Sequence, residues 1–396
     1  MVILVAHNLY QEPGGEDIVA AQEINLLRSA GHEVVEYYRF NSDINSIGIA
    51  NKAKIATRTL WATQSTRDFR QLIAQNKPDI AHFHNTFPLI SPSAYFSCRQ
   101  AGIPVIQTLH NYRLLCPSAI FYRDGHVCED CLGKLLPWPG VVHSCYRASR
   151  TQTAVATTML TVHHWLKTWQ KQVDVYISLS EFARTKFIKG GLPAEKLVVR
   201  QNFVYPDPGL GDGQENYAVY VGRLSPEKGI ETLLEAWEGL NSRIPLKIAG
   251  DGPLGPTVAE AAQRSDNIQW LGRLEKPQVI ALMKDATLLV LPSLLYENFP
   301  MVIAEAYAVG LPVVASNLGS MSSLVHHGVT GAHFRPGDSK DLATQIEWIL
   351  ADSQRLALMR HKARAEFEAK YTAEQNYKTL MSIYQRAIQT SDLRNA

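Results

Sequence analysis

Short apolar segments alternate with longer amphipathic segments along the whole chain. In the first half, strand-like runs are separated by stretches with helical spacing of apolar residues: VILVA, VVEYY, DIAHFH, IPVIQTLH and DVYISLS. The second half repeats the rhythm with YAVYVG, PLKIAG, NIQWLG, TLLVLPS and PVVAS. Strands that alternate with helices predict parallel sheets covered on both faces. We therefore expect an α/β protein with two doubly wound, Rossmann-like domains that face a central cleft.

The domain limits follow from where this periodic pattern stops. Pro, Gly and Asp cluster without apolar periodicity between residues 202 and 217, which is typical of a linker. We predict an N-terminal, acceptor-binding domain over residues 1–205, a linker over 206–216 and a C-terminal, donor-binding domain over 217–370. Residues 371–396 have apolar residues at helical spacing and predict a final helix that packs back toward the N-terminal domain.

Composition indicates a soluble globular protein, with 46% hydrophobic and 19% charged residues among 396. No apolar run reaches the roughly 18 to 20 residues of a membrane helix, and the start of the chain lacks a basic leader, so we expect a cytoplasmic protein. Basic residues outnumber acidic ones before residue 205, and the reverse holds after it. This asymmetry either is random or favours an acidic acceptor or an anionic membrane surface, and we expect no nucleic-acid partner.

Two loops lie where anions often bind in α/β proteins, and one of them is cationic while the other contains two glycines. Arg223 and Lys228 lie in a loop between a predicted strand and a predicted helix, where both charges and the helix amides can face a pyrophosphate. Gly14 and Gly15 precede the first helix of the front half, where glycines let a ligand approach the backbone. Solvated surface charges and a simple tight turn are the respective alternatives.

The segment GDGPLG matches the dinucleotide fingerprint G-x-G-x-x-G at Gly250, Gly252 and Gly255. However, Pro253 and Pro256 crowd the turn where a helix should begin, and no acidic residue ends the next strand to bind a ribose. We therefore interpret these glycines as shaping a loop beside the cleft, and a dehydrogenase is disfavoured.

Two carboxylates, Glu297 and Glu305, follow the buried strand TLLVLPS on either side of the expected start of a helix. The first can meet a sugar hydroxyl together with the backbone amides of the loop, and the second can meet a ribose. The loop residues are Asn298, Phe299, Pro300 and Met301. Glutamate is also a common helix residue, so the alternative is that the two glutamates have no shared function and are spaced this way by chance.

Four of the five cysteines, Cys116, Cys128, Cys131 and Cys145, fall within an insertion at about residues 112–150. A C-x-x-C pair with two flanking cysteines can hold a structural zinc ion, whereas reduced thiols and a disulfide are alternatives. The segment after it combines basic residues with Trp165, Leu166 and Trp169. It predicts either a helix facing the core or peripheral contact with a membrane or lipid-linked acceptor.

Several motifs together resemble the family 4 glycosyltransferases. GRLSPEKGIETLLEA, AGDGP, WLG, LPSLLYENFPMVIAEAYAVGLPVVAS and GVTGAHFRPGD are similar to the C-terminal domain of that family, and PGGED, HFHN, TLHNYRLLCP and SLSEFARTKF to its N-terminal domain. The resemblance covers essentially the whole chain. It implies the GT-B fold and retaining transfer of a sugar from a nucleotide-diphosphate donor without a catalytic metal.

The resemblance also implies roles for individual residues. Arg223 and Lys228 would hold the diphosphate, Glu305 the ribose, and Glu297 the hydroxyls of the transferred sugar, aided by the segment after it. Gly14 and Gly15 would approach the donor from the opposite wall. His110 matches the active-site histidine of the family, and a histidine at the end of a strand can hydrogen-bond a sugar hydroxyl or stabilise developing charge.

Two departures from the family pattern concern the site. Many members have Asp after the active-site histidine, where this chain has Asn111, and a second glycine and an acid where it has Ser320 and Ser323. We expect a retaining hexosyltransferase that acts by same-face attack on a saccharide or lipid-linked acceptor, with a UDP-sugar favoured over a GDP-sugar. The alternatives are a nucleotide-sugar epimerase or hydrolase, or an inactive, zinc-stapled nucleotide-sugar-binding protein.

Overall fold

The computed structural model describes residues 1–11, 14–44, 52–213, 215–240 and 243–395, and the chain forms two units. The first unit comprises Met1–Phe121, Glu129–Gln201 and Asn376–Ala396. The second comprises Tyr122–Cys128 and Asn202–Gln375. The main division after Gln201 lies close to the boundary predicted at residue 205. Residues 122–128 hold a small hairpin of β5 (Tyr122–Arg123) and β6 (His126–Val127).

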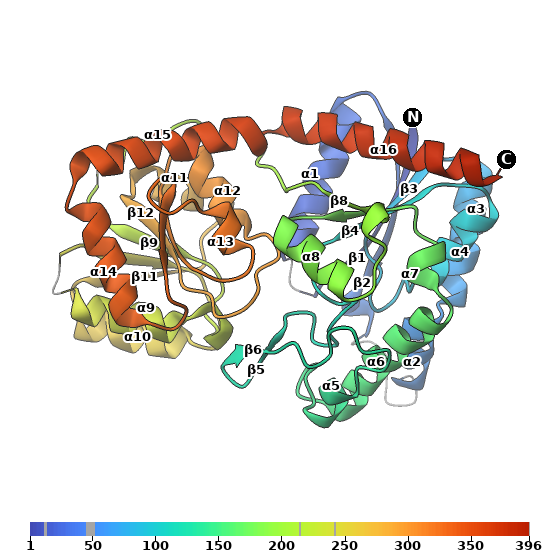
Figure 1. Ribbon diagram of the computed structural model, residues 1–396, viewed down its shortest axis with the longest axis horizontal. Coiled ribbons are helices and arrows are strands. Elements are labelled where there is room, and N and C mark those ends of the chain that lie inside the picture. The colour runs from blue at the N-terminus through green and yellow to red at the C-terminus, as the bar shows by residue number, and fades with distance from the viewer. Residues whose placement is uncertain (12–13, 45–51, 214, 241–242, 396) are drawn as a thin grey trace. The chain divides into compact units, whose positions relative to one another are not determined.

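The first unit is built on a parallel six-stranded sheet in the order β2-β1-β3-β4-β7-β8, with helices between successive strands (Figure 1). Because β1 and β3 are neighbours while β2 lies outside β1, the chain direction across the sheet reverses between β1 and β3. The strands are β1 (Val2–Leu9), β2 (Glu33–Phe40), β3 (Ile80–Asn85), β4 (Val105–Leu109), β7 (Val175–Ser178) and β8 (Leu197–Val199). The α-helices are α1 (Gly15–Ser29), α2 (Lys52–Leu60), α3 (Thr63–Asn76), α4 (Ser93–Gln100), α5 (Trp138–Val142), α6 (Arg150–Trp165), α7 (Thr168–Lys171) and α8 (Glu181–Lys189).

The last helix, α16 (Ala373–Asn395), supplies part of the core of the first unit. Its buried residues Leu380, Ile383 and Tyr384 pack with the strand residues Ile3 and Ile80 in one apolar cluster. Figure 1 shows α16 running past the sheet of this unit as the last, red segment of the chain. The apolar spacing at the end of the sequence is therefore explained by burial against strands from the beginning of the sequence.

The second unit has a parallel six-stranded sheet in the order β11-β10-β9-β12-β13-β14, and the direction reverses between β9 and β12. The strands are β9 (Ala218–Val221), β10 (Leu246–Ala249), β11 (Ile268–Gly272), β12 (Leu288–Leu291), β13 (Val313–Ser316) and β14 (Gly331–Phe334). The α-helices are α9 (Ile230–Gly239), α10 (Gly255–Arg264), α11 (Lys276–Asp285), α12 (Met301–Ala308), α13 (Met321–Leu324), α14 (Ser339–Leu350) and α15 (Ser353–Lys370). All four residues of β12 are buried, as expected for a central strand.

These sheets confirm the prediction of two doubly wound α/β domains. Each apolar run named as a strand in the sequence forms one, whereas the short edge strands β8 and β14 were not predicted. The segment with Trp165, Leu166 and Trp169 is not one continuous helix, because α6 ends at Trp165 and α7 begins at Thr168. Trp165 is 82% exposed and Trp169 only 3%, so Trp169 belongs to the core.

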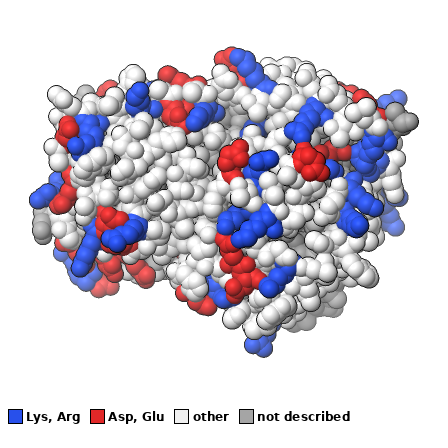
Figure 2. All heavy atoms as spheres, viewed as in Figure 1, with Lys and Arg blue, Asp and Glu red and all other residues white. Residues whose placement is uncertain are grey.

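In Figure 2, Lys and Arg lie next to Asp and Glu in several clusters, with wide uncharged areas between the clusters. None of the helices in the described ranges combines the length and apolarity needed to cross a membrane.

Candidate active site

The carboxyl ends of β9 and β12 carry the predicted donor residues of the second unit. In open α/β sheets, ligands bind outside the carboxyl ends of the strands at the point where the strand order reverses, because adjacent loops part there. In this unit the point lies between β9 and β12. Arg223 and Lys228 follow β9, and Glu297 follows β12. The topology therefore brings together groups that are about 70 residues apart in sequence.

Lys228 and Glu297 form an ion pair at this point. The Nζ atom of Lys228 lies 2.6 Å from Oε1 of Glu297, and the Ser293 hydroxyl donates to the same oxygen at 2.8 Å. The backbone that carries Lys228 turns at Gly229, whose φ is +71°. A Cβ at Gly229 would lie 1.9 Å from the carbonyl oxygen of Pro292, so only glycine lets this turn approach the end of β12 closely.

The loop that carries Glu297 is fixed by contacts of its backbone. Ser320 donates its hydroxyl to the carbonyl oxygen of Glu297 at 2.5 Å, and Ser323 donates to the carbonyl of Ser320 at 2.9 Å. The two serines that depart from the family pattern therefore support the loop. Phe299 is buried and packs edge-on against Tyr371, with the ring centroids 5.8 Å apart.

Pro300 is the N-cap of α12, one residue before the predicted position in the first turn. The amides of the first turn of α12 therefore face the same loop as Glu297. Glu305 lies on α12 and is buried, and it forms an ion pair with Lys276 at the start of α11. The sequence analysis did not identify Lys276, because nothing in its local pattern indicates a contact with a residue of α12.

Arg223 is exposed directly after β9, and the Tyr220 hydroxyl donates to its carbonyl oxygen at 2.8 Å. The loop of the glycine-rich segment lies beside this residue. A Cβ at Gly250 would be 1.8 Å from the carbonyl oxygen of Gly222, so the missing side chain lets the two loops touch. These contacts agree with glycines that shape a loop. The expectation that Pro253 and Pro256 hinder a helix here was wrong, because α10 begins at Gly255 with a proline in its first turn, where a missing amide hydrogen costs nothing.

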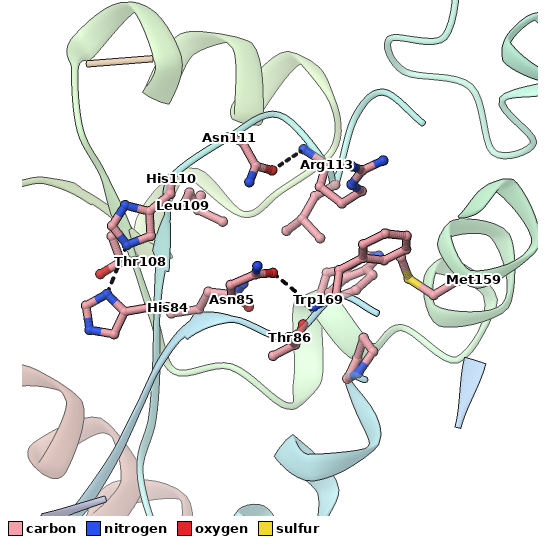
Figure 3. A pocket seen from close by; sticks show the side chains of 14 residues that line it. His84, Asn85, Thr86, Thr108, Leu109, His110, Asn111, Arg113, Met159 and Trp169 are labelled. Atoms are coloured by element: carbon pink, nitrogen blue, oxygen red, sulfur yellow. Dashed lines mark hydrogen bonds between the residues drawn. The ribbon is translucent and has the colours of Figure 1, made fainter. Parts of the chain in front are cut away.

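In the first unit, the predicted histidine lines a pocket beside the ends of β3 and β4 (Figure 3). The pocket is small, with a cavity volume of about 30 Å³. His110 follows β4, and its Nε2 lies 2.9 Å from Nδ1 of His84 at the end of β3. On the opposite wall, Arg113 stacks on Phe87 with 4.4 Å between the guanidinium carbon and the ring centroid.

Asn111, which also departs from the family pattern, donates its side-chain amide to Oε2 of Glu16 at 3.1 Å. Burial is the main cause that raises the pKa of Glu16, while His7 opposes it. An aspartate at position 111 would place a second carboxylate against Glu16. The amide therefore suits its surroundings because it donates a hydrogen bond where a carboxylate would repel.

Gly14 and Gly15 lie where α1 begins. The amide of Gly14 donates to Oδ2 of Asp17 at 2.6 Å, and Asp17 is also 2.7 Å from Nε2 of His7. Neither glycine has a positive φ. A Cβ at Gly15 would meet no atom within 4 Å, so the fold of this unit does not itself require glycine there.

Behind His110, His84 and His82 are buried next to the carboxylate of Glu23. Oε1 of Glu23 lies 2.9 Å from Nδ1 of His82 and 3.2 Å from Nε2 of His84. Burial favours the neutral form of Glu23, but Arg200, followed by the two histidines, holds the pKa of Glu23 well below its usual range. Burial lowers the pKa of His84 to about 4 and that of His110 well below its usual value.

Family models match nearly the whole chain. Residues 13–207 match the model described as Glycosyltransferase Family 4, and residues 206–366 match Glycosyl transferases group 1. The glycogen synthase of Mycobacterium tuberculosis is 33% identical over 362 residues, which cover 86% of this chain and 82% of that protein. The chain belongs to the family 4 glycosyltransferases. The alpha-D-kanosaminyltransferase of Streptomyces kanamyceticus is 26% identical over 301 residues, covering 73% of this chain and 72% of that protein.

Solved structures show the fold of this glycosyltransferase. Anabaena HepE in complex with UDP aligns with a TM-score of 0.67 at 19% identity over 96% of this chain and 99% of that chain. Sucrose-phosphate synthase from Thermosynechococcus elongatus aligns with a TM-score of 0.70 at 18% identity over 98% of this chain and 99% of that one. The predicted GT-B fold is confirmed.

The cysteines of this glycosyltransferase are all within the described residues, and none forms a disulfide. The Sγ of Cys116 is 3.1 Å from the Ser118 hydroxyl, and the Sγ of Cys131 is 3.7 Å from the Pro137 carbonyl oxygen. In the part of the chain that the structure describes, the group of His, Cys, Asp or Glu ligand atoms within 4.8 Å of one another is Glu23, His82 and His84. The zinc site at the cysteines stays a prediction.

Proposed function

We propose that this glycosyltransferase is a retaining hexosyltransferase that moves a sugar from a UDP-sugar to a saccharide or lipid-linked acceptor. The observation that carries the proposal is the pairing of Lys228 with Glu297 at the reversal point of the second sheet. A cation for the diphosphate and a carboxylate for sugar hydroxyls are adjacent there, as the two ends of one nucleotide-sugar require.

The diphosphate would contact Arg223, Lys228 and the first amides of α12. An anion at a helix N-terminus is favoured by the unpaired amides and by the helix dipole. When the bond from the sugar to the phosphate breaks, negative charge grows on the diphosphate. Fixed positive groups stabilise that charge more in the transition state than in the bound substrate, and this difference accelerates the reaction.

Glu305 would accept hydrogen bonds from the ribose hydroxyls, and Lys276 holds its carboxylate in place. An ionised acceptor makes stronger hydrogen bonds than a neutral one. UDP is the nucleotide in the complex of HepE, whose fold this chain shares, and this supports a UDP-sugar as the donor.

When the donor binds, Glu297 would give up its ion pair with Lys228 and accept hydrogen bonds from hydroxyls of the transferred sugar. The loop around the sugar would be formed by Asn298, Phe299, Pro300 and Met301. In the first unit, the open space at Gly15, next to Gly14, suits close approach by a phosphate or sugar. His110 would hydrogen-bond the reacting sugar.

For the chemistry we propose same-face attack. The bond from the anomeric carbon to the phosphate oxygen breaks, the bond to the acceptor oxygen forms on the same face, and the departing phosphate oxygen takes the acceptor proton. Arg223 and Lys228 supply the positive charge, so the proposal needs no catalytic metal.

The region around α5 and α6 supports contact with an anionic membrane, where a lipid-linked acceptor would reside. Six large apolar residues are exposed there: Leu135, Leu136, Trp138, Val142, Trp165 and Leu166. Residues 131–173 include five Lys or Arg and neither Asp nor Glu. In Figure 2 the area where Figure 1 places these helices is largely uncharged. Exposed apolar residues in a segment whose charged residues are all basic fit the interface of an anionic bilayer.

The membrane proposal is tested by sedimentation with vesicles. Binding to vesicles with anionic lipid should fall when Trp138 and Trp165 are both changed to Ser, and should be weak with purely zwitterionic vesicles. Equal binding to both kinds of vesicle would contradict it.

Release of UDP from a panel of UDP-hexoses and GDP-hexoses, with and without simple saccharide acceptors, tests the proposed reaction. We expect acceptor-dependent release from a UDP-sugar. Nucleotide binding without release under any acceptor condition would instead indicate an inactive binding protein, and an isomerised nucleotide sugar would indicate an epimerase.

A further inference from the structure

A buried chain of side chains leads from the pocket of the first unit to α1. We propose that Glu23 and His84 are positioning residues, which fix the ring of His110 in the tautomer with its proton on Nε2. This inference rests on the proposed function only in giving His110 a role at the reacting sugar. The arrangement itself is a property of the first unit.

The negative charge of Glu23 determines which atom donates and which accepts in each contact between Glu23, His84 and His110. Glu23 is ionised, so a lone pair on Nε2 of His84, 3.2 Å from Oε1, would face a negative charge. The proton of His84 is therefore on Nε2, and its Nδ1 accepts. Since that Nδ1 lies 2.9 Å from Nε2 of His110, the latter nitrogen donates (Figure 3). The remaining nitrogen of His110, Nδ1, then has a lone pair and can accept a hydrogen bond from a sugar hydroxyl.

The carboxylate of Glu23 is itself held in place by side chains from several helices and strands. Arg200 donates its Nη2 to Oε2 of Glu23, and its Nε donates to Oδ1 of Asn376 at 3.1 Å. His82 places Nδ1 2.9 Å from Oε1 of Glu23 and equally far from the Tyr384 hydroxyl. The side chain of Glu23 is only 1% exposed, and that of Arg200 only 5%. A buried carboxylate with these partners cannot rotate without leaving a charge unpaired, so it is a fixed reference for the histidines.

Burial and all but one of the titratable groups near His110 favour its neutral form. Burial comes first among the causes that lower its pKa, followed by His84 and His7, and His82 acts in the same sense. Glu23 opposes them. The imidazole therefore works as a neutral hydrogen-bonding group at physiological pH.

A metal ion is the competing interpretation of the same residues. The ligand atoms of Glu23, His82 and His84 lie within 4.8 Å of one another, a spacing that suits a divalent cation. However, Arg200 already neutralises this carboxylate, and a dication would lie beside the buried guanidinium. Like charges in a buried site repel strongly, so the structure favours direct contact of Glu23 with the two histidines over a bound metal ion.

Two histidines on one strand provide a matched pair for the test. His82 and His84 are both buried in β3, both contact Glu23, and their rings stack at 4.5 Å. His84 contacts His110, whereas the second nitrogen of His82 lies 2.8 Å from the Thr108 hydroxyl. Replacement of either ring should therefore disturb the core similarly but affect His110 differently.

We would measure kcat, the KM for the donor, the UDP affinity and the melting temperature of His84→Phe, His82→Phe and His84→Asn in the full chain. His84→Phe should lower kcat by about 10- to 100-fold with unchanged UDP affinity, as expected when an oriented histidine loses its partner. His82→Phe removes one partner of Glu23 but no contact of His110, so it should lower kcat much less than His84→Phe does. His84→Asn should recover most of the lost kcat, because the Asn oxygen can accept in place of Nδ1. Equal losses of kcat in both Phe variants would overturn the inference.

Nitrogen NMR of histidine-labelled protein, assigned with a His110 variant, gives a readout that does not depend on activity. We expect Nδ1 of His110 to have the chemical shift of an unprotonated nitrogen in the wild type and to change in His84→Phe. A protonated Nδ1 in the wild type, or a stoichiometric metal ion lost in both Phe variants, would contradict the proposal. If His84→Phe fails to fold, the activity of His84→Asn and the spectrum of the wild type still test the proposed tautomer. Absence of transfer by a protein with the expected tautomer would refute the proposed function and leave this inference standing.

Discussion

Lys228 and Glu297 are joined by a 2.6 Å ion pair between the ends of the strands where the order of the second sheet reverses. The two side chains are only 26% and 12% exposed, so each keeps the other neutralised and in place. A nucleotide-sugar offers replacements for both partners, an anionic diphosphate for the lysine and hydroxyl donors for the glutamate. The pair therefore resembles a site that is pre-ordered before its ligand arrives.

Glu297→Ala should abolish transfer yet spare UDP binding. The variant loses the acceptor for the sugar hydroxyls, while Lys228 is released to the diphosphate. We expect kcat to fall by about 100- to 1000-fold, comparable to removal of one preorganised group from a transition state. The measurement is UDP release together with calorimetric UDP binding.

Glu215→Ala is the matched control for that variant. Glu215 also pairs with a lysine of the second unit, Lys247 at 2.9 Å, but its side chain is 60% exposed. Turnover by the control should stay at the wild-type level. Unchanged turnover by Glu297→Ala would refute the role assigned to Glu297.

Glu305→Ala should weaken UDP binding by about 10- to 100-fold, because hydrogen bonds to a charged group contribute about 1.5–3 kcal/mol. The effect should depend on the ribose. We therefore expect wild-type protein to discriminate UDP from 2′,3′-dideoxy-UDP by calorimetry, and Glu305→Ala to bind the two alike. Discrimination that survives in the variant would show that another residue holds the ribose.

Asn111→Asp should destabilise the protein more at neutral pH than at low pH. The new carboxylate would lie against Glu16, so the folded state raises the pKa of one carboxyl group above its unfolded value. Such a group contributes stability below its unfolded pKa, and the contribution is lost as pH rises through the folded pKa. The difference in unfolding free energy between wild type and variant should therefore grow from pH 4 to pH 7, by about 1–2 kcal/mol. A difference that is independent of pH would contradict the contact.

The buried His84 gives a pH dependence of the opposite sign. Its folded pKa is about 4, below the usual value of 6.5, so the unfolded chain binds the proton more readily between these values. The contribution of His84 is complete above pH 6.5 and is lost as pH falls toward 4, amounting to up to about 3 kcal/mol. Urea titrations should show that His84→Asn lacks this part of the acid destabilisation. An identical pH dependence in both proteins would contradict the buried neutral imidazole.

If the cysteine-rich insertion holds zinc, protein purified with its thiols reduced should contain about one zinc ion per chain. Cys128→Ser and Cys131→Ser should lose it, and the thiol Cys98, which is buried in α4, should be irrelevant to metal content. Well under one zinc per wild-type chain would dispose of the site.

The architecture, and the position of three candidate site residues just after strand ends, could be predicted because their signals are local. TLLVLPS reads as a buried strand, and Arg223, Lys228 and Glu297 follow strand ends, where parallel sheets place their ligands. The edge strands β8 and β14 escaped prediction because runs of three or four residues carry little periodicity.

The contacts that complete the site could not be predicted, because they depend on the order of strands and helices. Lys276 and Glu305 meet from different helices, and Glu23 meets His84 and Arg200 from segments far away in the sequence. One local signal was present: His82 and His84 are two residues apart in a strand that is buried throughout, so both point to the same side. Paired histidines in such a strand require polar partners.

The most direct test of the proposed reaction is proton NMR of the anomeric signal during transfer from an α-linked UDP-hexose to a saccharide acceptor. We predict that the first product has the α configuration and that UDP appears at the same rate. A first product with the β configuration would contradict retaining transfer.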